Sequence, residues 1–189
     1  MKIAKAKPSQ ANVIAKLIME AMNYDCCKYF TGEDHTLEEF EEMMTYLVSI
    51  KGTQYSYENT IVALSDDGEV AGMCTSYDGA EILNLRTPFE QEALRRFGRD
   101  FSTMQAESAA GEMYFDTICV DKRFRHQGIA SSLIIASIGK AITLGHEAVG
   151  LLVDKGNPNA ERLYLQTGFE WVNDTSWGGH PMRHLQYKL

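Results

Sequence analysis

Cysteine is scarce in this chain, and its four cysteines form no recognisable site. Cys26, Cys27, Cys74 and Cys119 lack the paired spacing of a zinc site, and the adjacent pair cannot readily bridge to itself. We therefore expect reduced thiols, as in a cytoplasmic protein, and no bound metal.

Long apolar runs are also missing. No stretch approaches the roughly 18 consecutive apolar residues that a transmembrane helix requires. Residues 1–6 are too short and too alternating for a signal peptide, and they are typical of a first strand. The sequence therefore predicts a protein that does not use a membrane as partner.

Positive charge is the third deficit. The chain has 18 Lys and Arg against 26 Asp and Glu, which gives a net charge of −8. This balance argues against a nucleic-acid partner and favours a cationic or neutral one. Linkers, repeats and low-complexity tracts are absent, and 189 residues of 44% hydrophobic content can bury a sizeable core. We expect one domain spanning residues 1–189.

Hydrophobic periodicity predicts alternating helices and strands. Ser9 is expected to cap a first helix, the capping box Thr36-x-x-Glu39 starts a second, and Thr87-Pro88-Phe89-Glu90 starts a third that ends near Gly98. Alternating or continuous apolar runs predict strands at residues 60–64, 69–77, 112–120, 148–153 and 184–189.

The most informative segment joins a predicted strand to a predicted helix. The strand 112–120 is followed by a short basic loop, and Arg125-x-x-Gly128-x-Ala130 then opens an apolar helix that runs to about Leu144. A helix start presents unpaired backbone N–H groups and partial positive charge, to which Arg123 and Arg125 add full charges. Such a loop suits a pyrophosphate, although it matches neither the dinucleotide fingerprint nor the P-loop.

A second segment follows about 25 residues later. Residues 149–153 form a short apolar run, typical of a strand buried on both faces. A helix should follow, with Asn157 as its N-cap, Pro158 at the first helical position and Gly168 as a left-handed stop.

These two segments together resemble the two motifs of the GNAT superfamily of acetyl-CoA-dependent N-acetyltransferases. The first motif is carried by Arg125, Gly128 and Ala130. The second, N-x-x-A-x-x-L-Y-x-x-x-G-F, is matched at Asn157, Ala160, Leu163, Tyr164, Gly168 and Phe169. The resemblance covers residues 112–172. It implies a mixed α/β fold whose central, mostly antiparallel sheet has one splayed parallel strand pair, 112–120 with 148–153, and is flanked by helices.

The resemblance also implies how acetyl-CoA is held as co-substrate. The pantetheine arm is expected between the splayed strands, bonded to the backbone of Ile118 and Val120. The pyrophosphate is expected beside Arg125 on the amides of residues 126–131, which are His126, Gln127, Gly128, Ile129, Ala130 and Ser131. Asn157 can bond the pantetheine amide, cap its helix, or do both.

Acetyl transfer to an amine requires two proton transfers. The amine must lose a proton before it attacks, and the departing CoA thiolate benefits from gaining one. Glu112 is the first candidate for the base, Asp116 on the same strand face is the alternative, and ordered water is a third. The resemblance makes Tyr164 the donor to the CoA sulfur; the other interpretation is a core aromatic residue.

The acceptor side departs from the family pattern. Short GNAT members join the strands before and after residues 79–110 by a tight turn, whereas here a helical insertion lies between them. We expect this insertion and residues 23–50 to wall the acceptor pocket, with aromatic surface from Tyr24, Tyr29, Phe30 and Phe40.

Two functions remain open from the sequence. The first is N-acetylation of a small-molecule or peptide amine by a monomer or homodimer. The second is a non-catalytic acyl-CoA-binding sensor or partner-binding module.

Overall fold

The computed structural model describes residues 1–189, which form one seven-stranded sheet in the order β1-β2-β3-β4-β5-β7-β6. The strands are β1 Lys2–Lys5, β2 Thr60–Leu64, β3 Val70–Asp78, β4 Met113–Val120, β5 Ala148–Asp154, β6 Glu170–Trp177 and β7 His180–Lys188. Every neighbouring pair is antiparallel except β4–β5, which is parallel. The predicted mixed α/β fold is confirmed.

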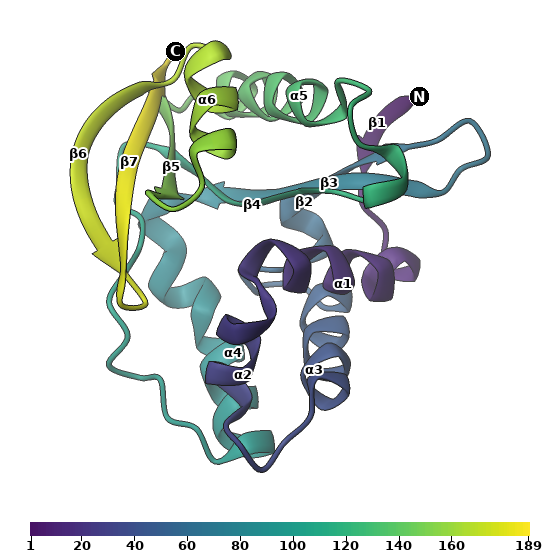
Figure 1. Ribbon diagram of the computed structural model, residues 1–189, viewed down its shortest axis with the longest axis vertical. Coiled ribbons are helices and arrows are strands. Elements are labelled where there is room, and N and C mark those ends of the chain that lie inside the picture. Colours follow the sequence, from purple (N-terminus) through teal and green to yellow (C-terminus); the bar gives the residue numbers. More distant parts are fainter.

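Six α-helices cover the two faces of this sheet. They are α1 Ala11–Met22, α2 Tyr24–Thr31, α3 Leu37–Ser49, α4 Ile82–Phe97, α5 Ile129–Leu144 and α6 Pro158–Gln166. Figure 1 shows α5 and α6 on one face and α1 to α4 on the other. Each face has its own buried apolar cluster, so the sheet separates two cores.

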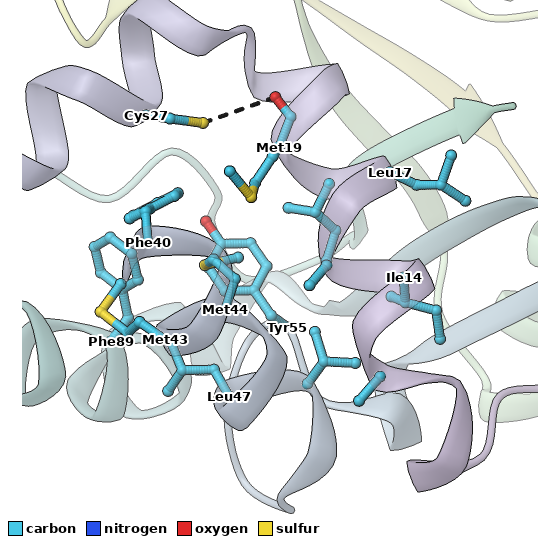
Figure 2. Packing of buried hydrophobic residues seen from close by; sticks show 14 of the residues in the cluster. Ile14, Leu17, Met19, Cys27, Phe40, Met43, Met44, Leu47, Tyr55 and Phe89 are labelled. Carbon is cyan, nitrogen blue, oxygen red and sulfur yellow. Dashed lines mark hydrogen bonds between the residues drawn. The ribbon is translucent and has the colours of Figure 1, made fainter. Parts of the chain in front are cut away.

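The larger core lies between the sheet and α1 to α4. Side chains from α1, α3 and α4 interlock there, and the Cys27 thiol donates to the carbonyl of Met19 at 3.7 Å (Figure 2). Phe30 and Phe40 belong to this core and are 3% and 0% exposed. The expectation that these two residues offer aromatic surface to an acceptor is therefore wrong, because packing of the helical layer buries both.

Two of the three predicted helix starts are also corrected. Gln10 rather than Ser9 is the N-cap of α1, because a 3₁₀ turn at Pro8–Gln10 precedes the helix. Helix α4 begins at Ile82, so Thr87 is inside it and donates its hydroxyl to the carbonyl of Leu83 at 2.9 Å. The Thr36–Glu39 capping box is confirmed, with both reciprocal hydrogen bonds present.

A β-bulge interrupts the pairing of β3 with β4. Thr75 pairs with Thr117, but Ser76 pairs with Phe115, so Asp116 is an extra residue without a partner. The bulge resets the alternation of side chains along β4. Phe115 and Ile118 face the α5 side, while Asp116 contacts Tyr77 on the opposite side.

The parallel pair β4–β5 separates almost at once. Only Met113 with Val149 and Tyr114 with Gly150 are paired, whereas β5 pairs with β7 along its whole length. From Phe115 to Val120, the edge of β4 that faces β5 therefore has no neighbouring strand. The predicted splay is confirmed.

The insertion between β3 and β4 is closed at its base. The backbone N–H of Gly79 donates to the carbonyl of Glu112 at 3.0 Å, and the Ser108 hydroxyl donates to the carbonyl of Gly79 at 3.0 Å. A Cβ at position 79 would lie 2.3 Å from the carbonyl oxygen of Ala109. The two ends of the insertion can meet because residue 79 has no side chain.

We predict that Gly79→Ala destabilises the protein by roughly 1–3 kcal/mol, because the Ala109 backbone must move to admit the methyl group. Gly139→Ala is the control. Gly139 lies within α5 with nothing within 4 Å of its added Cβ, so alanine should stabilise the helix by up to about 1 kcal/mol. Urea unfolding of both variants tests the pair, and equal stabilities would contradict the proposed closure.

Candidate active site

The loop between β4 and α5 has the geometry of an anion site. A 3₁₀ turn at Lys122–Phe124 follows the strand, and His126 and Gly128 then adopt left-handed conformations with φ of 61° and 75°. No protein acceptor contacts the backbone N–H groups of residues 126–131. These free donors stand at the positive end of the 16-residue helix α5.

The basic side chains of this loop are already engaged within the protein. Arg125 donates to Glu20 of α1 at 2.6 Å and to the carbonyl of Val120 at 3.2 Å. Arg123 pairs with Asp121 at 2.9 Å. Both arginines therefore contact protein carboxylates, and the donors of this loop without a protein partner are its backbone N–H groups.

The remaining loop residues lie beside this row of N–H groups. Ile129 is buried under the sheet, Ala130 and Ser131 are half-buried in the first turn of α5, and Gln127 is exposed. Gln127 and Ile129 also line a shallow hollow with the N-terminal residues Met1 and Ile3. A ligand on the loop would thus contact backbone more than side chain.

The second motif forms helix α6 on the same side of the sheet. Asn157 caps this helix by accepting from the N–H of Ala160 at 3.2 Å. Tyr164 packs edge-on against Phe169, with ring centroids 5.8 Å apart, at the margin of the α5-side core. Burial raises the pKa of the Tyr164 phenol, and the nearby Cys74 adds to this rise. Tyr164 is therefore protonated at neutral pH.

Asp116, at the bulge, points to the opposite side of the sheet. Its carboxylate accepts from the Tyr77 hydroxyl at 2.5 Å, from the Gln54 amide at 3.3 Å and from the Thr117 hydroxyl at 2.7 Å. Burial raises the pKa of Asp116, and these three hydrogen bonds oppose the rise. The group is thus a held carboxylate of increased basicity, on the stretch of β4 that has no pairing with β5.

Glu112 also faces that side, as the predicted shared face of the strand requires. Its Oε2 accepts from Gln186 at 2.9 Å and lies 3.0 Å from Nε2 of His184, both on β7. The carboxylate lies directly over Gly150 of β5, where an added Cβ would be 1.9 Å from Oε2. Gly150 therefore provides the space in which Glu112 reaches β7.

The structure adds a carboxylate that the sequence did not single out. Glu107, near the end of the insertion, pairs with the buried Arg86 of α4 at 2.8 Å. Burial and the charge of Asp116 raise its pKa, Arg86 lowers it, and the result is a pKa of about 7. Glu107 belongs to no motif, and its position depends on how the insertion folds back, so the sequence carries no signal for it.

A cavity of about 200 Å³ joins several of these groups. Its walls come from the end of the insertion, from β4 and β5, and from the β6–β7 hairpin; the lining residues are Ala106, Glu107, Ser108, Ala109, Glu112, Leu152, Asn173, Thr175, Ser176 and His184. Figure 1 shows the loop from α4 to β4 passing beside that hairpin. Residues 23–50 do not line this cavity, and α2 and α3 pack in the helical core.

Comparison with known proteins gives the family. The model of the acetyltransferase (GNAT) family matches residues 19–169, which include both motifs and the insertion. The crystal structure of an acetyltransferase shares 28% identity with a TM-score of 0.81, covering 100% of this chain and 99% of that one. An N-acetyltransferase from Staphylococcus aureus Mu50 has a TM-score of 0.82 at 22% identity, covering 99% of this chain and 100% of that one, and thus shares the fold.

A curated relative matches over a shorter range. GCN5-related N-acetyltransferase 6 of Arabidopsis thaliana, described as chloroplastic, is 35% identical over 72 residues. These residues make up 38% of this chain and 25% of the plant protein, so the chain spans about a quarter of that relative's length. The protein belongs to the acetyltransferase (GNAT) family.

Two other features of the described chain bear on its ligands. No helix combines the length and the apolarity needed to cross a bilayer. No three His, Cys, Asp or Glu side chains come together in an arrangement that could hold a metal ion.

Proposed function

We propose that the protein transfers an acetyl group from acetyl-CoA directly to a primary amine of a small-molecule or peptide acceptor. One observation carries this proposal: an anion-binding loop and Tyr164 lie on one side of the opening between β4 and β5, and a cavity with buried carboxylates lies on the other. The family places the chain among enzymes and so disfavours the non-catalytic acyl-CoA-binding module.

On the donor side, the pyrophosphate of acetyl-CoA is assigned to the free N–H groups of residues 126–131. The pantetheine arm then follows the open edge of β4 and bonds the backbone of Ile118 and Val120, as an added strand would. Asn157 caps α6 with its side-chain oxygen, which leaves its amide N–H₂ for the pantetheine. Arg125 supports the loop through Val120 and Glu20.

On the acceptor side, an amine reaches the thioester from the cavity. Its nitrogen attacks the carbonyl carbon and loses a proton, and the C–S bond then breaks. We assign the base to Asp116, because the bulge places it beside the opening and burial increases its basicity. Glu112 is the alternative, although His184 and Gln186 already engage its Oε2. Tyr164 donates its hydroxyl proton to the departing thiolate.

The donor assignment is tested by thermal unfolding. Acetyl-CoA should raise the melting temperature, because a ligand that binds only the folded state stabilises it by about 2.7 kcal/mol at 100 times its Kd. Gly128→Asp should abolish this rise by placing a carboxylate among the N–H groups. Gly52→Asp is the control, at another left-handed glycine with open space around its added Cβ. A folded Gly128→Asp protein with unchanged affinity would refute the pyrophosphate site.

The reaction itself is tested with 1-aminobutane, 1,4-diaminobutane and alanine amide, by measuring CoA thiol release and the mass gain of the amine. Tyr164→Phe should lower kcat about 10²-fold, because it removes only the proton donor, while the KM for acetyl-CoA changes little. Tyr187→Phe is the control, since Tyr187 packs against the same Phe169 ring. An unchanged kcat, where chemistry limits turnover, would leave Tyr164 as a packing residue.

The two candidate bases are separated by amide variants. We predict that Asp116→Asn lowers kcat by about 10²-fold or more, whereas Glu112→Gln has a clearly smaller effect. Both changes preserve size and remove the basic oxygen. The reverse order would assign the base to Glu112, and two small effects would favour removal of the proton through water.

A further inference from the structure

We propose that Glu107, carried into the site by the insertion and held by Arg86, is the carboxylate that binds the ammonium group of the acceptor. This inference rests on the proposed function and adds a charge requirement to it. It also gives the insertion a role, because the binding group for the acceptor comes from the segment in which this chain departs from the short-turn pattern.

The first step of the argument is how firmly Glu107 is placed. Arg86 is 1% exposed, and its guanidinium donates to the carbonyls of Met104 and Gln105 at 2.9 and 3.0 Å as well as to the Glu107 carboxylate at 2.8 Å. Its Nε bonds Glu90 one helical turn away at 3.2 Å. One buried side chain thus fixes the backbone before Glu107 and the carboxylate itself.

The second step is where this carboxylate lies. The Glu107 side chain is only 7% exposed, yet it lines the same cavity as Glu112 and His184. The other walls offer hydroxyl and amide groups from Ser108, Asn173, Thr175 and Ser176, and no Lys or Arg lines the cavity. The cavity therefore suits a cation with hydrogen-bond donors better than an anion.

The third step compares the three carboxylates of this side. Asp116 accepts three hydrogen bonds and is assigned to proton removal, and Glu112 is held by two residues of β7. Glu107 has one charged partner, which also bonds Glu90. It is therefore the carboxylate most available to an incoming ammonium, with which it would form a charge-assisted hydrogen bond.

Ionisation of Glu107 should make acceptor binding depend on pH. With a pKa of about 7, the carboxyl is neutral at pH 6 and charged at pH 8, so attraction for a cation should increase across this range. Charged and titratable groups surround Glu107 from every neighbouring element. They are Arg86 and Glu90 of α4, Glu112 just before β4, Tyr114 and Asp116 of β4, Tyr55, Tyr77 of β3 and His184 of β7.

The test uses butylguanidinium in the absence of acetyl-CoA, because this cation keeps its charge and its N–H donors from pH 6 to pH 8 and its binding then reports on the protein alone. Calorimetry should show its Kd falling about tenfold from pH 6 to pH 8 in the wild type. In Glu107→Gln, binding should be about tenfold weaker at pH 8 and nearly independent of pH. Glu92→Gln is the control, because it removes a carboxylate of α4 that pairs with Arg95 and Arg96 outside the cavity.

A second pair of variants covers the case in which Glu107→Gln does not fold. Ser176 lines the cavity from an exposed position on β6, so Ser176→Lys adds a cation there without disturbing Arg86. It should weaken binding of butylguanidinium, whereas the uncharged Ser176→Gln should not.

Kinetics with the best amine of the panel complete the test. Glu107→Gln should raise the KM for the amine about tenfold and leave the KM for acetyl-CoA unchanged. Wild-type affinity and pH dependence in folded Glu107→Gln, or equal binding by the two Ser176 variants, would overturn the inference. Absence of acetylation by the wild type, with cation binding still lost in Glu107→Gln, would instead refute the proposed function.

Discussion

The separation of β4 from β5 is the constraint on which the site depends. Two parallel strands normally continue side by side, but here pairing stops after Tyr114 and Gly150, and the bulge of β4 at Asp116 follows two residues later. The sheet nevertheless remains continuous, since β5 is fully paired with β7 on its other edge. The middle of the sheet is thus open along one edge of β4 while both cores stay buried.

The conformation of the segments proposed to bind the donor could be predicted from the sequence because its determinants are local. A strand, a left-handed glycine and a helix start are encoded within residues 112–130, and the cap and stop of α6 within residues 157–168. Backbone conformation determines the structure of these segments. The free N–H groups of the loop can therefore be predicted from the order of residue types. The ion pairs of Arg123 and Arg125 could not be predicted from the sequence in this way, because their partners include Glu20, about 100 residues away.

The cavity proposed to bind the acceptor could not be predicted in the same way. Glu107, Arg86 and His184 meet through the return of the insertion and the pairing of β5 with β7, and neither contact has a periodic or spaced signal. The prediction that Phe30 and Phe40 offer aromatic surface to an acceptor was wrong for a related reason. Their composition suits a pocket wall as well as a core, and only the packing of α2 and α3 against α4 decides between the two.

The closed base of the insertion has a consequence for how such a protein can diverge. Because Gly79 meets Ala109 and Glu112, the 30 or so residues between them form a loop whose ends are already joined by the sheet. Helix α4 in this loop belongs to the core, but the entropy of closing a loop grows only with the logarithm of its length, so changes of length between α4 and Glu112 that spare the core residues change stability little. Related proteins could therefore differ in this wall of the cavity, while the strands, the bulge and the loop before α5 stay the same.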